Sequence, residues 1–106
     1  MPLTIEEKKH YRALAHPLKP IVTIAGKGLS EGVLQEVDRA LNDHELIKVK
    51  VKVGDREVKH QVIEELCTAL KADWVQTIGN TAILLRRAAK PNPKLSNLIR
   101  HGGVSN

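Results

Sequence analysis

A glycine-rich turn that carries a lysine is the part of this chain best suited to chemistry. It reads Ala25-Gly26-Lys27-Gly28 and lies between an apolar stretch, residues 21–24, and Ser30, a residue suited to the N-cap of a helix. Glycine has no Cβ, so backbone N–H groups of such a turn can approach an anion closely. The helix that follows adds unpaired N–H groups and the positive end of its dipole. We therefore expect the turn to bind phosphate, with Lys27 supplying a full charge.

This turn has a simpler interpretation, which is that glycine only serves the geometry of a strand-to-helix connection. It also lacks the Gly-x-x-x-x-Gly-Lys-Ser/Thr spacing of a P-loop, so nucleotide hydrolysis is not indicated.

A second group of cations lies on a predicted strand. Residues 46–53 alternate between apolar and basic side chains, which places Lys48, Lys50 and Lys52 on one face, about 6–7 Å apart. That spacing is of the scale of successive phosphates along a nucleic-acid strand. The alternative is a solvated face, or lysines that protect a sheet edge against aggregation.

Composition narrows the class of protein. The chain has 106 residues, 42% of them hydrophobic, which is enough for the core of one domain. Its net charge of +5 favours RNA, DNA or an anionic membrane surface as partner, although many basic proteins bind no polyanion. The single cysteine, Cys67, excludes an internal disulfide, and there is no signal segment or membrane-spanning run. We expect a cytoplasmic protein that does not act at a membrane.

Side chains for catalysis or metal binding do not gather in the sequence. The five histidines show no metal-ligand spacing with each other or with Cys67, so we expect no metal, no cofactor and no small-molecule substrate. Tyr11 and Trp74 are the only aromatic residues of the Phe, Tyr and Trp types, which argues against a platform on which bases stack. Trp74 is expected to serve mainly in packing.

The secondary-structure pattern predicts an α+β (α/β) domain. Thr4 and Glu7 form a capping box at the start of the first helix, and Gly79-Asn80 is a hairpin turn. The predicted order is αβαβαββ, which gives a compact mixed four-stranded sheet packed by three helices. Helices are expected over residues 5–15, 31–44 and 56–71, and strands over 21–24, 46–53, 74–78 and 81–85. Residues 88–106 are predicted to be a basic, mobile tail with a short helix near 95–99.

Four motifs carry a resemblance to a known family. In chain order they are Leu14-Ala15-His16-Pro17-Leu18-Lys19-Pro20, Gly28-Leu29-Ser30-Glu31-Gly32-Val33, His44-Glu45-Leu46-Ile47-Lys48-Val49-Lys50 and Val75-Gln76-Thr77-Ile78-Gly79-Asn80-Thr81. Together they resemble the CRM (chloroplast RNA splicing and ribosome maturation) domain, in its stand-alone bacterial YhbY form. The resemblance covers residues 3–87, so residues 1–87 are expected to form the domain.

The resemblance implies a fold similar to the C-terminal domain of translation initiation factor three. It also implies RNA binding, a Gly-x-x-Gly loop, and association with precursors of the large ribosomal subunit. This chain departs from the family in two places: Ala25 replaces the first loop glycine, and Leu85 replaces a tyrosine before Arg86. If the first position needed a positive φ, Ala25 would be strained there.

These observations lead to a hypothesis of function. We expect a monomeric, non-enzymatic protein that binds ribosomal RNA within the large-subunit precursor and acts in ribosome assembly. Alternatives are a DNA-binding nucleoid-type protein, an RNA-processing enzyme, or a protein-interaction module whose basic face is incidental. The expected RNA-binding residues are Ala25, Gly26, Lys27, Gly28, Ser30, Lys19, Lys48, Lys50 and Arg86, with Lys9 and Arg12 beside them if the first helix is suitably rotated.

Overall fold

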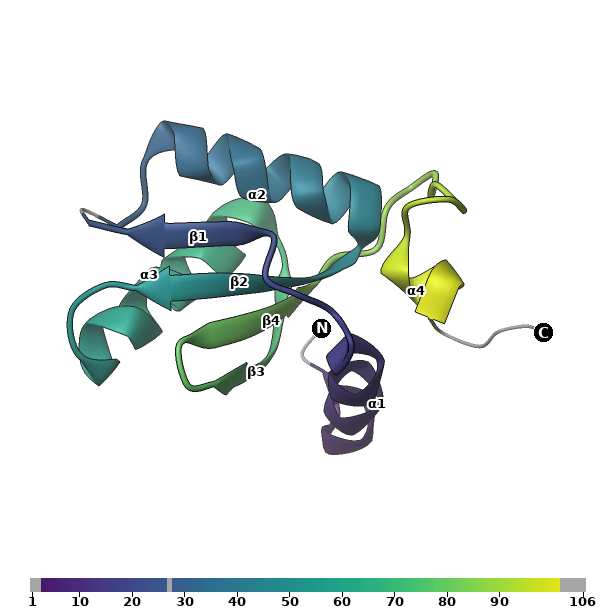
Figure 1. Ribbon diagram of the computed structural model, residues 1–106, viewed down its shortest axis with the longest axis horizontal. Coiled ribbons are helices and arrows are strands. Elements are labelled where there is room, and N and C mark those ends of the chain that lie inside the picture. Colours follow the sequence, from purple (N-terminus) through teal and green to yellow (C-terminus); the bar gives the residue numbers. More distant parts are fainter. Residues whose placement is uncertain (1–2, 27, 102–106) are drawn as a thin grey trace.

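The computed structural model describes residues 3–26 and 28–101 (Figure 1). It confirms the α+β class and the predicted order, and a short helix follows the last strand. The elements are α1 (Ile5–Ala15), β1 (Val22–Ala25), α2 (Glu31–His44), β2 (Leu46–Lys52), α3 (Arg56–Leu70), β3 (Asp73–Ile78), β4 (Thr81–Leu85) and α4 (Asn97–His101). None of the helices so described is long and apolar enough to cross a membrane.

The four strands form one mixed sheet in the order β1-β2-β4-β3. β1 and β2 are parallel, because α2 carries the chain back between them, whereas β4 is antiparallel to both of its neighbours. Ala25 at the end of β1 pairs with Lys52 at the end of β2, and Thr81 at the start of β4 pairs with Lys50. The glycine-rich turn, the β2–α3 connection and the β3–β4 turn therefore meet at one end of the sheet, on the left in Figure 1.

The two faces of the sheet are covered by different helices. One face packs on α2 and α3 through a core that includes Ile24, Val49, Val51 and Leu66. The other face packs on α1 through a smaller cluster, whose buried members are Tyr11, Ala15, Leu46, Val75, Ile83 and Leu85. Because side chains alternate along β2, its three lysines lie on the α1 face.

Each long helix begins at a side-chain cap that the sequence supplies. Thr4 and Glu7 make the reciprocal capping box, with N···O distances of 3.0 and 2.9 Å. The Ser30 hydroxyl accepts from the Val33 N–H at 3.2 Å, and the Asp55 carboxylate accepts from the Val58 N–H at 3.0 Å. These caps fix where α2 and α3 begin, next to the turns at the left end of the sheet.

The segment after β4 packs against the domain through Glu45. This residue is 3% exposed, and its carboxylate accepts from the Ser96 hydroxyl at 2.6 Å and from the Ala88 N–H at 2.7 Å. The Asn97 side chain also donates to the Leu46 carbonyl at 2.7 Å. Residues 88–101 thus make fixed contacts that the expected free tail does not have, and the expected short helix is present as α4.

Candidate nucleic-acid interface

The glycine-rich turn adopts a backbone that its glycines make possible. Gly26 has a φ of +65° and Gly28 a φ of +87°, both in the left-handed region. Ala25 is the last residue of β1 and does not need this conformation, so Gly26 takes over the positive φ. The departure from the family's first loop glycine is therefore accommodated without strain at Ala25. Lys27 lies outside the described residues.

The start of α2 lies directly after the turn. The Ser30 hydroxyl satisfies the Val33 N–H, while the N–H groups of Glu31 and Gly32 have no hydrogen-bond acceptor within residues 3–26 and 28–101. These N–H groups and the helix dipole favour an anion. The carboxylate of Glu31 lies in the same first turn and opposes an anion there. The turn needs further positive charge to hold phosphate, and β2 supplies it.

Lys50 and Lys52 are the two lysines of the stripe nearest the glycine-rich turn, and Lys50 is half-buried whereas Lys52 is exposed. Lys50 lies between Thr23 on β1 and Thr81 on β4, and Lys52 lies beside Ala25 at the turn. Neither ammonium group forms an ion pair or hydrogen bond with any residue in the described part of the chain. Both charges are therefore available to a ligand that also contacts the glycine-rich turn.

Lys48 has a different role from the other two lysines. Its ammonium group donates to the backbone carbonyls of His16 at 3.2 Å and Leu18 at 3.0 Å. Both acceptors lie in the connection that leaves α1 and enters β1. Lys48 thus fixes this connection against the sheet, and one of its three donors remains for a ligand.

A groove runs between α1 and the sheet and is basic on both sides. It has a volume of about 690 Å³ and is lined by Lys9, Arg12, Ala13, His16, Lys48, Ile78 and Ile83. The rotation of α1 therefore brings Lys9 and Arg12 to the same face as the lysine stripe. Arg12 also donates to the Gln76 side chain at 3.4 Å. Lys19 is exposed in the connection between α1 and β1.

Arg86 lies away from this face and is engaged by the protein itself. One terminal nitrogen donates to the Asp38 carboxylate at 2.8 Å and the Leu70 carbonyl at 2.9 Å. The other donates to the Asp38 carbonyl at 3.0 Å and the Asn42 side chain at 2.9 Å. Arg86 follows the end of β4 that pairs with the start of β2, opposite the glycine-rich turn. Its expected place among the RNA-binding residues has no support in this geometry.

Two cations that the sequence analysis did not single out lie near the turn end. Arg56 and Lys59 occupy the first turns of α3 and line a pocket with Trp74. Their i, i+3 spacing directly after the Asp55 cap was the available signal, because residues three apart share a helix face. Trp74 is half-buried, and part of its indole faces this pocket rather than the core. No group of three or more His, Cys, Asp or Glu side chains converges as a metal site in the part that the structure covers.

Comparison with known proteins identifies the family of this chain. The CRS1 / YhbY (CRM) domain family matches residues 3–86. The chain belongs to the CRM-domain family. The "Probable RNA-binding protein PA4753" of Pseudomonas aeruginosa is 47% identical over 104 residues, which cover 98% of this chain and 100% of that one. An "RNA-binding protein" of Haemophilus influenzae is 49% identical over 84 residues, covering 79% of this chain and 85% of that one.

A solved structure shares the fold. The solution structure of protein SAV1595 from Staphylococcus aureus, described as a proposed RNA-binding protein, superposes with a TM-score of 0.75 at 32% identity. The similarity covers 88% of this chain and 96% of that one. The resemblance noted from the four motifs is therefore confirmed by sequence and by structure.

Proposed function

We propose that this CRM-domain protein binds RNA, without catalysing a reaction, and acts as a monomer in assembly of the large ribosomal subunit in the cytoplasm. The observation that carries the proposal is the pair Lys50 and Lys52, which have no partner among residues 3–26 and 28–101, beside a glycine-rich turn with two left-handed glycines. The names of relatives that are 47% and 49% identical support RNA as the partner. The ribosomal precursor is what the resemblance to the stand-alone bacterial family implies.

The mechanism follows from where the positive groups lie. Backbone N–H groups at the start of α2 would contact one phosphate, next to Lys52, while the Gly28 N–H donates to the Ala25 carbonyl and fixes the shape of the turn. Lys50 would contact a neighbouring phosphate along the strand, since alternate side chains of β2 are about 6–7 Å apart. The groove between α1 and the sheet then extends the basic surface through Lys9 and Arg12. Contacts of this kind position RNA by its backbone and shape more than by its sequence.

Sedimentation through a ribosome gradient tests this proposal. We expect the wild type to co-sediment with large-subunit precursors and Lys50→Glu/Lys52→Glu to stay at the top. The matched control is Lys90→Glu/Lys94→Glu, which makes the same charge change at exposed positions of the C-terminal segment and should behave as wild type. Circular dichroism verifies that all three proteins are folded.

Each outcome of the gradient discriminates between functions. If both charge variants stay on the particle, protein contacts rather than the lysine face hold the domain there. If wild type itself stays at the top, the ribosomal part of the proposal is wrong. Competition between folded RNA and duplex DNA for the purified protein then separates an RNA-binding protein from a DNA-binding one, because only RNA offers the 2′-hydroxyl and the A-form groove.

A further inference from the structure

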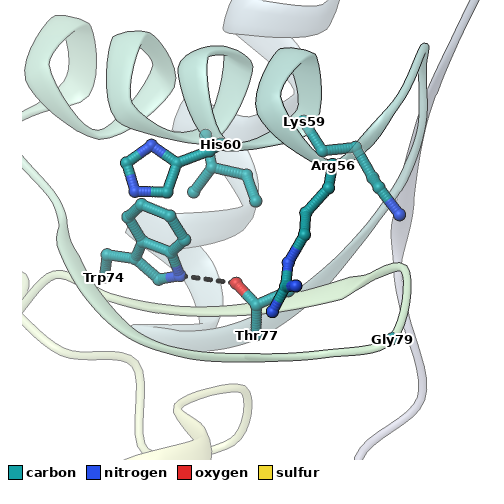
Figure 2. Close-up of a pocket in the computed structure, with 7 residues that line it drawn as sticks. Arg56, Lys59, His60, Trp74, Thr77 and Gly79 are labelled. Atoms are coloured by element: carbon teal, nitrogen blue, oxygen red, sulfur yellow. Dashed lines mark hydrogen bonds between the residues drawn. The ribbon is translucent and has the colours of Figure 1, made fainter.

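A second pocket lies around the edge of the sheet from the lysine face. It has a volume of about 440 Å³ and is formed between the first half of α3 and the end of β3. Figure 2 shows its labelled residues: Arg56, Lys59 and His60 descend from the helix, and Trp74, Thr77 and Gly79 lie on the strand and its turn. The pocket is within the size range of small-molecule sites, about 300–1,000 Å³, and has room for one nucleotide.

The inner wall of this pocket is aromatic and apolar. The rings of His60 and Trp74 meet edge to face, with centroids 4.8 Å apart and an interplanar angle of 61°. The indole N–H donates to the Thr77 hydroxyl at 2.8 Å, which fixes the indole against β3 (Figure 2). Buried Ile63 forms part of the lining behind these rings. Such a wall accepts the flat, apolar face of a planar ring.

The rim of the pocket is positively charged. In Figure 2 the Arg56 side chain reaches down from α3 toward Thr77. Its guanidinium makes no hydrogen bond or ion pair with any residue that the structure describes. Lys59 donates to the Asn80 side chain at 2.5 Å and thereby ties α3 to the β3–β4 turn. The planar apolar wall can contact a ring, and the guanidinium beside it can bind a phosphate attached to that ring.

We propose that this pocket holds one unpaired nucleotide of the bound RNA, with its base against Trp74 and its phosphate at Arg56. The inference rests on the proposed function and names a subsite of the same interface. The Thr77 hydroxyl, whose oxygen already accepts from the indole, has its own hydrogen left to donate to a ring nitrogen or carbonyl of the base. His60 adds a second polar group at the edge of that base.

Continuity with the lysine face supports RNA as the occupant. Lys50 lies on β2 and the pocket lies at β3, two strands away, so about 10 Å separates the two strands at about 4.8 Å per strand, and the lysine and the pocket lie on opposite faces of the sheet. Ile78 lines the α1 groove while its neighbour Thr77 lines the pocket, so the end of β3 is the border between the two. A single strand that leaves the lysine stripe can turn around this edge and place an unstacked base further along its chain in the pocket.

Trp74 makes the test direct, because it is the only tryptophan of the chain. Its emission is followed while an end-labelled single-stranded adenine RNA is added, and fluorescence anisotropy of the label reports binding in the same titration. The comparison probe is an abasic ribose-phosphate chain of the same length. The variant is Arg56→Gln, and the control Arg39→Gln removes the same charge from an exposed position on α2.

The proposal expects the adenine RNA to quench Trp74 emission and the abasic chain to leave it unchanged. Adenine RNA should bind about 5- to 150-fold more tightly than the abasic chain, as found for stacking on an aromatic side chain. Arg56→Gln should weaken the binding of adenine RNA and reduce the quenching of Trp74 emission, whereas Arg39→Gln should do neither.

Other results separate failure of the pocket from failure of RNA binding itself. If anisotropy shows that adenine RNA binds while Trp74 emission stays constant, the pocket is not a base site and the proposed function stands. Equal quenching by both probes would also overturn the base site, because the phosphate chain alone would then cause it. If neither probe binds, the pocket inference fails, and the ribosome gradient and the competition with folded RNA still decide the proposed function.

Discussion

Replacement of Arg86 by alanine should lower the stability of the protein and leave its RNA affinity unchanged. The guanidinium joins α2 to the end of α3 by four hydrogen bonds to the protein, and its side chain is 19% exposed. The change to alanine leaves the Leu70 and Asp38 carbonyls, and the Asp38 carboxylate, without this donor.

The size of the effect follows from these partners. Hydrogen bonds to a charged group contribute about 1.5–3 kcal/mol each when they are buried. The side chain of Asp38 is 47% exposed, so solvent replaces much of that contact, and the two carbonyl acceptors dominate. We expect a loss of about 3 kcal/mol, which lowers Tm by about 10–20 °C for a domain of this size. Lysine cannot reproduce the fork of contacts, so Arg86→Lys should recover less than half of the loss.

The assay is urea unfolding followed by circular dichroism, together with RNA titration well below the new Tm. The control Arg39→Ala removes an exposed arginine that is adjacent to Asp38 in sequence, and it should change stability by at most about 0.5 kcal/mol. The reasoning is refuted if Arg86→Ala keeps the stability of the wild type and loses RNA binding. Arg86 would then be the RNA contact that the sequence suggested.

Two further changes test the packing of α3. Gly54→Ala should lower the free energy of unfolding in urea by about 2 kcal/mol or more, because Gly54 has a φ of +46° and a Cβ there would lie 2.8 Å from the Val58 Cβ. The control Gly32→Ala, in α2, should not destabilise the protein, and equal effects of the two changes would contradict this reasoning. Burial first, and the Asp73 carboxylate second, raise the pKa of the Cys67 thiol to about 12. The folded state therefore favours the neutral thiol, and its contribution to stability should fall as pH rises from about 8.5 towards 12. At pH 8, iodoacetamide should alkylate the native thiol much more slowly than the urea-unfolded one, because the native thiol is buried and holds its proton. Similar rates would contradict the burial.

The elements were predictable because their signals are local. The alternation over residues 46–53, the Thr4–Glu7 capping box and the Gly79-Asn80 turn each involve residues that are near in sequence. Local signals also placed the glycine-rich turn between β1 and α2. The parallel pairing of β1 with β2 followed from the helix between them.

The roles of single charges were not predictable in the same way. Lys48 and Lys50 look equivalent in the alternating strand, yet the acceptors of Lys48 lie 30 and 32 residues away in sequence. Arg86 finds Asp38 and Asn42 at separations of 48 and 44 residues. Only the folded chain shows which cations already bind groups of the protein. Lys48 and Arg86 do so, whereas Lys50 and Lys52 do not in the part of the chain that the structure describes.

The C-terminal segment and Trp74 illustrate the same limit. Composition predicted a free basic tail over residues 88–106, but the Ser96 hydroxyl donates a hydrogen bond to the Glu45 carboxylate, 51 residues away in sequence. The lack of other aromatic residues argued against base stacking, and sequence could not show that Trp74 shares an open pocket with His60 and Arg56. Both features depend on tertiary contacts.

The salt dependence of RNA affinity tests the central claim most directly. If about four phosphates are engaged, the slope of log K against log salt concentration should be about −3 to −4, and Lys50→Gln/Lys52→Gln should reduce it to about −1.5 to −2. The control Lys90→Gln/Lys94→Gln should keep the wild-type slope. A wild-type slope near zero, or equal slopes for the two double variants, would contradict an interface built on the glycine-rich turn and the lysines of β2.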